Sequence, residues 1–212
     1  MDIFSILIAI AIVLVSLSVH EAAHAWTADR LGDPTARMLG RVSLNPIVHI
    51  DPIGTILLPA LAAFSRLPII GWAKPVPVNI GQLRNPRRDF MLVAAAGPIS
   101  NLLQALVAAV GLRVLFPVAA VSTGSDAMLS IVGNVLYLAI NINVLLAVFN
   151  LIPVPPLDGG NVLAGLLPDG PASLFMRMRP YGVLILYGLM FTGALSAMIQ
   201  PPANFLLGLL IP

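Results

Sequence analysis

An uncharged apolar run at the start of the chain restricts the fold more than any other feature. Residues 3–19 contain no charged side chain, and the apolar-rich stretch continues to Trp26. A transmembrane helix needs about 20 such residues. A cleaved signal peptide is the alternative, and residues 23–25 resemble a cleavage site. However, Asp2 stands where a signal peptide carries Lys or Arg, and the run exceeds an ordinary signal-peptide core. We therefore predict a membrane-spanning helix over about residues 3–26.

The composition extends this conclusion to the whole chain. Of the 212 residues, 58% are hydrophobic and 9% are charged, whereas soluble domains carry about 25% charged residues. So little charge cannot cover a water-facing surface, which excludes a soluble enzyme and makes the lipid bilayer the main surroundings. The net charge of +2 gives no reason to expect a nucleic-acid partner. The absence of cysteine excludes disulfides, thiolate metal sites and cysteine nucleophiles.

Further apolar segments predict a polytopic bundle. Residues 90–116 and 128–152 are candidate core spans, and residues 181–199 are a further span. Residues 53–64 are too short to cross a membrane as a helix and contain a proline, which favours a re-entrant segment.

Short extended strands are expected in the polar connection over residues 27–89. Residues 73–78 alternate in character and contain two prolines, which is typical of an edge strand. The predicted fold class is an all-α membrane protein with these short strands added.

One motif concentrates the groups that carry hydrolytic chemistry. His20-Glu21-x-x-His24 contains the only glutamate and two of the three histidines of the chain. On a helix, residues i and i+4 lie about 40° apart, so both imidazoles face one point and can share a metal ion. The alternative is a set of polar residues capping a membrane helix. Ionisable groups at a helix centre cost about 2.5–3.5 kcal/mol each, which favours a functional site.

A catalytic zinc site needs a third protein ligand and an open position for water. A second glutamate cannot supply this ligand, because Glu21 is the only one. The extended motif with a third histidine also fails, since Thr27 and Arg30 occupy its Gly and His positions. The remaining candidates are His49 and the aspartates.

Asp158 is the strongest candidate among the aspartates. It follows a proline-rich stretch, residues 153–156, that ends the preceding span and keeps the chain extended. Gly159 and Gly160 allow the backbone to approach another element closely. The alternative role for Asp158 is an N-cap of a helix over residues 159–167.

The number of membrane crossings is compatible with this assignment. Asp158 meets the histidine pair if an even number of spans separates them, and residues 90–116 and 128–152 supply two. This count requires that residues 53–64 do not cross.

The basic residues predict the orientation. The loop over residues 117–127 contains no Lys or Arg. Ten of the eleven basic residues lie in or beside residues 27–89 and 157–180, and Arg113 is the exception. The positive-inside rule then places the metal site toward the cytoplasmic side.

Four motifs together resemble a known family over about residues 20–165. They are His20-Glu21-x-x-His24, Asn45-Pro46-x-x-His49-x-Asp51-Pro52-x-Gly54, Gly97-Pro98-x-x-Asn101 and Asn150-x-x-Pro153-x-x-x-Leu157-Asp158-Gly159. This combination resembles the compact bacterial branch of the site-2 protease family, the intramembrane zinc metalloproteases of peptidase family M50.

The resemblance implies one zinc ion per chain, held by His20, His24 and Asp158. It implies that Glu21 activates the water and that Asn150 binds the substrate or stabilises the oxyanion. We include His49 and Asn101 in the predicted site as accessory residues.

We therefore predict a zinc-dependent intramembrane endopeptidase in a bacterial cell membrane, formed as a single domain over residues 1–212. Its catalytic core is residues 1–167 and its C-terminal membrane segment is residues 180–212. The expected partner is a membrane-protein substrate with a locally unwound helix, paired with residues 73–78 by strand addition. The sequence predicts no oligomeric state.

A non-proteolytic membrane metal-binding protein or metal transporter is the alternative function. It is disfavoured because the spans over residues 90–116 and 128–152 carry no carboxylate that could mark an ion pathway.

Overall fold

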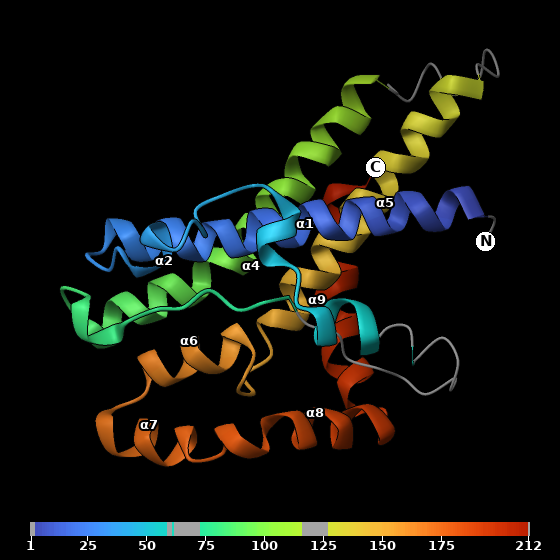
Figure 1. Ribbon diagram of the computed structural model, residues 1–212. Coiled ribbons are helices and arrows are strands. Elements are labelled where there is room, and N and C mark those ends of the chain that lie inside the picture. The colour runs from blue at the N-terminus through green and yellow to red at the C-terminus, as the bar shows by residue number, and fades with distance from the viewer. Residues whose placement is uncertain (1–2, 59–60, 62–72, 116–126, 212) are drawn as a thin grey trace.

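Helices form the whole of the described architecture (Figure 1). The computed structural model of the chain describes residues 3–58, 61, 73–115 and 127–211. Its α-helices are α1 (Ile3–Arg30), α2 (Thr35–Met38), α4 (Pro86–Leu115), α5 (Ala127–Asn150), α6 (Asp158–Leu166), α7 (Asp169–Met176), α8 (Gly182–Phe191) and α9 (Ala194–Leu210). Short 3-10 turns are η1 (Pro46–His49), η3 (Ile80–Gln82) and η4 (Arg179–Tyr181), and η2 (Pro52–Leu57) is a π-helical turn.

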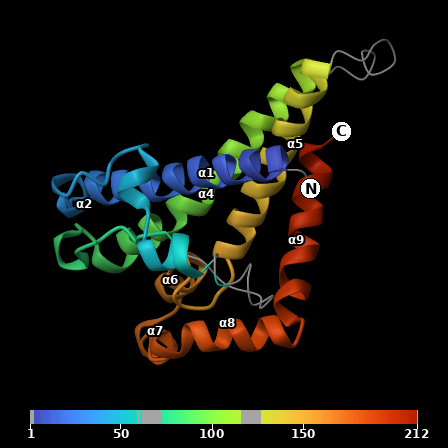
Figure 2. The ribbon, with the colours of Figure 1, turned by 45° about the vertical axis from the view of Figure 1, so that its right-hand side comes forward.

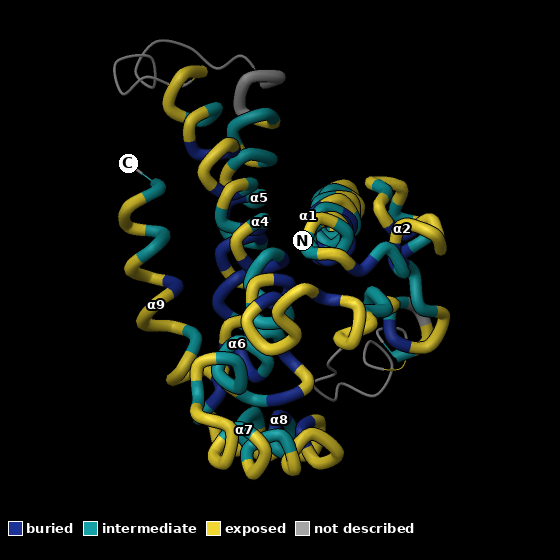
Figure 3. The backbone as a smooth tube through the Cα atoms, turned by 90° about the vertical axis from the view of Figure 1, so that its left-hand side faces the viewer, coloured by how far each residue is buried: buried dark blue, intermediate teal, exposed yellow. Residues whose placement is uncertain are grey.

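Three helices have the length and hydropathy of membrane spans. They are α1, α4 and residues Ile131–Asn150 of α5, with mean hydropathies of 2.6, 1.7 and 2.0. These helices correspond to the three core spans predicted from the sequence. Large apolar side chains such as Leu7 and Val107 are exposed on their outer faces, as expected for helices surrounded by lipid. Buried positions gather where α4 and α5 pack together (Figure 3), and α1 also buries one side, which includes Ser16, His20 and Ala25.

The predicted strands are wrong for the part of the chain that the structure describes, which contains no strand. Over residues 73–78, the two prolines have no N–H to donate, and the Lys74 N–H donates to His49 O. The carbonyl oxygens of Lys74 and Pro75 accept hydrogen bonds from the Arg41 guanidinium. This segment is therefore held by isolated hydrogen bonds and by the Arg41 side chain, and it has no strand partner with a ladder of main-chain hydrogen bonds.

The predicted span over residues 181–199 is divided between two helices. The helix α8 ends at Phe191, and Gly193 takes a left-handed conformation with φ 76°. This conformation is typical of a glycine that ends a helix. The axis then bends by 81° between the α7–α8 segment and α9. The α8 helix lies across one end of the bundle, and α9 returns along α5 (Figure 2).

Part of the predicted re-entrant segment lies outside the described residues. Residues 53–57 belong to the π-helical turn η2, and residues 59–60 and 62–64 are not described. Of the predicted loop over residues 117–127, residues 117–126 are not described, and Ala127 begins α5.

Small residues let α4 approach α5 and α9 closely. Ala105, Ala108 and Ala109 of α4 form a buried cluster with Ile140, Val144 and Val148 of α5 and with Ala203 of α9. Close backbone approach of this kind drives helix association in lipid, where apolar burial gives little advantage. At the far end, Arg113 donates to Leu209 O at 3.0 Å and joins α4 to the end of α9.

A buried arginine organises the connection between α2 and η3. The Arg41 side chain is 6% exposed, and its guanidinium donates to the carbonyl oxygens of Val48, Lys74 and Pro75. The same connection is held to α1 by Asp33, whose carboxylate accepts a hydrogen bond from Asn79 N.

We expect Arg41→Met to lower the free energy of unfolding by at least about 2 kcal/mol, because hydrogen bonds from a charged group each contribute about 1.5–3 kcal/mol. The measurement is the midpoint of thermal unfolding in detergent micelles. Arg37→Met is the matched control, since its side chain is 64% exposed and pairs with Asp29 at the surface. Such pairs contribute about 0–1 kcal/mol, so equal shifts for the two variants would contradict the role of Arg41.

Candidate metal centre

The centre begins with two imidazoles one helical turn apart on α1. The Nε2 atoms of His20 and His24 lie 3.0 Å apart, and the ring planes are inclined by 82°. Both side chains are buried. The i, i+4 spacing on a regular helix is sufficient to produce this convergence.

Asp158 reaches the same point from a distant part of the sequence. The helix α5 ends at Asn150, a short proline-rich loop follows, and Asp158 is the first residue of α6. Its Oδ2 lies 3.1 Å from His20 Nε2 and 3.3 Å from His24 Nε2. The structure therefore brings His20, His24 and Asp158 together, with one candidate ligand atom from each.

The outward hydrogen bonds determine where the imidazole lone pairs point. His24 Nδ1 donates to Val93 O at 2.7 Å, and His20 Nδ1 donates to Asn101 Oδ1 at 2.6 Å. In a neutral imidazole, Nε2 then keeps its lone pair. Two lone pairs and a carboxylate oxygen thus converge, and a cation between them removes their mutual repulsion.

The spacing of these three atoms suits zinc. Zinc binds nitrogen and carboxylate oxygen at about 2.0–2.1 Å in tetrahedral geometry, which separates ligand atoms by about 3.3–3.4 Å. The observed separations are 3.0, 3.1 and 3.3 Å. Two imidazoles and one carboxylate are also a ligand set that leaves a fourth position open for water.

Asp158 is held in its charged form. Burial by itself raises the pKa of this carboxyl group. In the metal-free protein, where protons take the place of a metal ion, hydrogen bonds and charge from the protonated His20 and His24 imidazoles outweigh burial and lower the pKa to about 2. The side chain is therefore a carboxylate at neutral pH, as a metal ligand has to be.

Helix α4 can pass the imidazoles only because residue 97 is a glycine. A Cβ at Gly97 would lie 2.3 Å from His24 Nε2 and 2.5 Å from His20 Nε2. Residue 97 ends a run of small residues over positions 94–97, and its missing side chain lets α4 cover the candidate metal ligands.

The loop before Asp158 is folded tightly against α6. A Cβ at Gly159 would lie 2.2 Å from Leu151 O, which agrees with the close approach expected at this glycine. Leu157 is buried in a cluster with Ile152, Leu186 of α8 and Leu195 of α9. The last two helices therefore support the loop that carries the third candidate ligand.

The other candidate residues lie in different situations. Glu21 is half-buried on α1. Because it follows His20 directly, its side chain projects about 100° around the helix axis from that of His20. Asn150 is the last residue of α5, and its Nδ2 donates to Leu146 O at 2.9 Å. His49 ends η1, and its Nε2 contacts Ser43 O at 2.8 Å. Among the described residues, the convergent group contains neither Glu21 nor His49.

Sequence reasoning missed two contributions to the centre. A main-chain carbonyl such as Val93 O leaves no signal in a sequence. Asn143 is a polar residue within an apolar span, which is a signal in the sequence, and in the structure its Oδ1 accepts a hydrogen bond from Asn101 Nδ2 at 2.9 Å.

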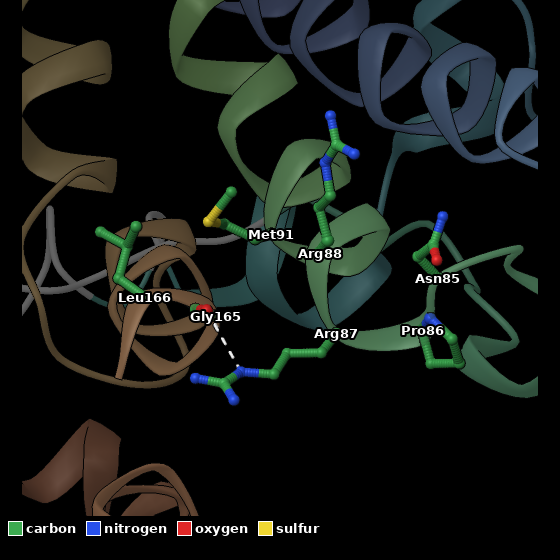
Figure 4. A pocket seen from close by; sticks show the side chains of 7 residues that line it. All are labelled: Asn85, Pro86, Arg87, Arg88, Met91, Gly165 and Leu166. Atoms are coloured by element: carbon green, nitrogen blue, oxygen red, sulfur yellow. Dashed lines mark hydrogen bonds between the residues drawn. The ribbon is translucent and has the colours of Figure 1, made fainter. Parts of the chain in front are cut away.

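A surface cavity lies apart from these ligands, between the start of α4 and the end of α6. Its volume is about 500 Å³, and Arg87 crosses it to donate to Gly165 O at 3.2 Å (Figure 4). Its lining residues are Asn85, Pro86, Arg87, Arg88, Met91, Gly165 and Leu166.

Comparison with known proteins gives the family. The sequence model of Peptidase family M50 matches residues 113–191. YwhC of Bacillus subtilis (strain 168), provisionally named a zinc metalloprotease, is 39% identical over 90% of this chain and 83% of its own length. The provisionally named zinc metalloprotease Rip2 of Mycolicibacterium smegmatis (strain ATCC 700084 / mc(2)155) is 32% identical over 86% of this chain and 66% of its own. Rip2 of Mycobacterium tuberculosis (strain ATCC 25618 / H37Rv) is 35% identical over 69% of this chain and 52% of its own. No solved structure matches the chain.

The chain therefore belongs to peptidase family M50, as the motifs predicted, and is a metalloprotease. Together with the three long apolar helices, membership of this family identifies an integral membrane protein.

We expect Gly97→Ala to lower zinc affinity by about tenfold or more, because the new methyl group displaces both imidazoles from the ligand positions. The measurement is zinc per chain after dialysis against a competing chelator. Gly111→Ala, in the same helix, is the control: its Cβ would lie 3.6 Å from Leu136 Cδ2, an ordinary contact. Retention of zinc by both variants would contradict the arrangement.

Proposed function

We propose that this protein is a zinc-dependent intramembrane endopeptidase that hydrolyses peptide bonds of transmembrane segments. The observation that carries the proposal is the convergence of His20 Nε2, His24 Nε2 and Asp158 Oδ2 inside a bundle of apolar helices. Family membership supports the same reaction class.

In this proposal, His20, His24 and Asp158 hold one zinc ion per chain. The ion supplies a Lewis acid that polarises a carbonyl and acidifies a water molecule. The protein contributes the fixed orientation of both imidazoles, through the hydrogen bonds of their Nδ1 atoms to α4.

Glu21 acts as the general base and then as the general acid. It is the only glutamate of the chain and is adjacent to a proposed ligand. Its carboxylate accepts the proton of the attacking water and returns it to the leaving nitrogen.

Asn150 contributes a donor to the oxyanion. One Nδ2 hydrogen is engaged by Leu146 O, so the other hydrogen of this amide is the one that serves the substrate. In other hydrolases, a single neutral donor of this kind stabilises the transition state by about 2.7–4 kcal/mol.

The substrate is a membrane protein whose helix unwinds locally, because an intact helix hides its peptide bonds in the hydrogen-bonded backbone. The cleavage site lies toward the cytoplasmic side. This orientation is supported by the distribution of basic residues, because ten of the eleven lie in or beside the connections 27–89 and 157–180.

We expect Glu21→Gln to keep zinc and to lower the rate of cleavage about 10²–10⁴-fold, because general acid–base catalysis contributes that amount. The measurements are zinc content and cleavage of a transmembrane-helix substrate in detergent micelles. Asp158→Asn is the companion variant and should lose zinc as well as activity. Zinc bound to the wild type without cleavage of any substrate would favour a metal-binding protein.

Orientation can be tested with single cysteines, because the chain has none of its own. Ser173→Cys lies on exposed α7, near the metal-site end, and Leu115→Cys lies at the opposite end of α4. A membrane-impermeant maleimide should label Ser173→Cys in inverted vesicles and Leu115→Cys in intact spheroplasts. The reverse pattern would contradict the cytoplasmic assignment.

A further inference from the structure

Asn143 is a buried polar residue in the middle of a membrane span. Its side chain is 3% exposed, and a polar group in this position is costly unless its hydrogen bonds are made. Asn143 Nδ2 donates to Ala139 O at 3.0 Å, in its own helix. Its Oδ1 accepts from Asn101 Nδ2 at 2.9 Å, and Asn101 Oδ1 accepts from His20 Nδ1 at 2.6 Å. A hydrogen-bonded chain thus runs from α5 through α4 to the candidate metal ligand on α1.

The direction of every bond in this chain follows from its first member. Ala139 O is a carbonyl oxygen and can only accept, so the Asn143 amide has to turn its NH₂ group toward it. Asn143 Oδ1 then faces Asn101 and can only accept. Asn101 has to donate through Nδ2, which leaves its Oδ1 facing His20.

The last step fixes the imidazole. An amide oxygen can accept but not donate, so His20 Nδ1 carries the hydrogen and His20 Nε2 keeps its lone pair. If the Asn101 amide turned over, its NH₂ group would face His20 Nδ1 and would favour the opposite tautomer, with hydrogen on Nε2. That tautomer cannot bind a metal through Nε2.

We propose that Asn143 is a positioning residue that selects the metal-binding tautomer of His20 by orienting the Asn101 amide. The inference rests on the zinc site of the proposed function. It adds a residue of α5 to those that determine how His20 presents its lone pair to the metal. His24 needs no such relay, because its Nδ1 donates directly to the main-chain carbonyl of Val93.

Helix packing alone does not account for this arrangement. Asn141, two residues earlier on α5, makes the same bond to its own helix, with Nδ2 donating to Tyr137 O at 2.8 Å. The hydrogen bond that connects to Asn101 and the metal centre belongs to Asn143. Asn141 is therefore a matched control for the loss of an asparagine from this span.

The test compares zinc affinity in two backgrounds. In the natural background, Asn143→Leu should weaken zinc binding about 10–100-fold, as changes behind a metal ligand usually do, and Asn141→Leu should not. In an Asn101→Asp background, Asn143→Leu should have less than about a threefold effect, because a carboxylate at position 101 only accepts and needs no orientation. A loss of equal size in both backgrounds would mean that Asn143 only packs, and would overturn the proposal.

Nitrogen-15 NMR of the metal-free protein provides a readout that does not depend on zinc. The chain has three histidines, so few imidazole signals need assignment. At a pH where the rings are neutral, His20 should carry hydrogen on Nδ1 in the wild type and on both nitrogens, as a mixture, in Asn143→Leu. An unchanged tautomer in the variant would overturn the proposal.

Two further comparisons separate misfolding from loss of the Asn143 role, and failure of the proposed function from failure of this inference. Asn143→Val replaces Asn143→Leu if the larger side chain prevents folding, judged by monodispersity in detergent. Failure of the wild type to bind zinc at all would contradict the proposed function, whereas a zinc-binding wild type with an unaffected Asn143→Leu variant contradicts only the role of Asn143.

Discussion

The hydrogen bonds that His20 and His24 make to α4 are the interactions on which the rest of the centre depends. They join the two helices and turn both Nε2 atoms inward. Two converging lone pairs repel each other in a low-dielectric interior, and only a cation or shared protons relieve this repulsion. The fold therefore creates a strong local demand for positive charge before any substrate arrives.

The carboxylate that adds to this demand is supplied by a separate part of the chain. Asp158 is brought to the histidines by the tight loop after α5, which the C-terminal helices support through Leu186 and Leu195. Buried charges are tolerated when they are paired, and here the pairing joins an early helix to a late one. Formation of the candidate metal centre therefore depends on the tertiary structure, since neither helix alone contains all three candidate ligands.

The sequence predicted the centre better than it predicted the periphery. The convergence of His20 and His24 follows from helix geometry, the even number of crossings was compatible with Asp158 joining them, and the family resemblance singled out Asp158. Residues 73–78 were misjudged because alternation with proline looks like an edge strand, whereas Arg41 takes the carbonyl oxygens that a ladder would use. The break at Gly193 was missed because hydropathy remains high on both sides of it. The orientation of Asn101 depends on a contact between α4 and α5 that no local pattern records.

The short helix α9 has a consequence for the surrounding lipid. Its 17 residues span about 25 Å, while the hydrocarbon core of a bilayer is about 30 Å thick. Arg113 holds the end of α9 to α4, so α9 cannot shift along the bundle to hide the difference. If α9 crosses the bilayer, the mismatch of about 5 Å is met by local thinning, by flanking side chains that reach the interface, or by oligomerisation. Local thinning at α9 would shorten the path by which water reaches a buried hydrolytic centre.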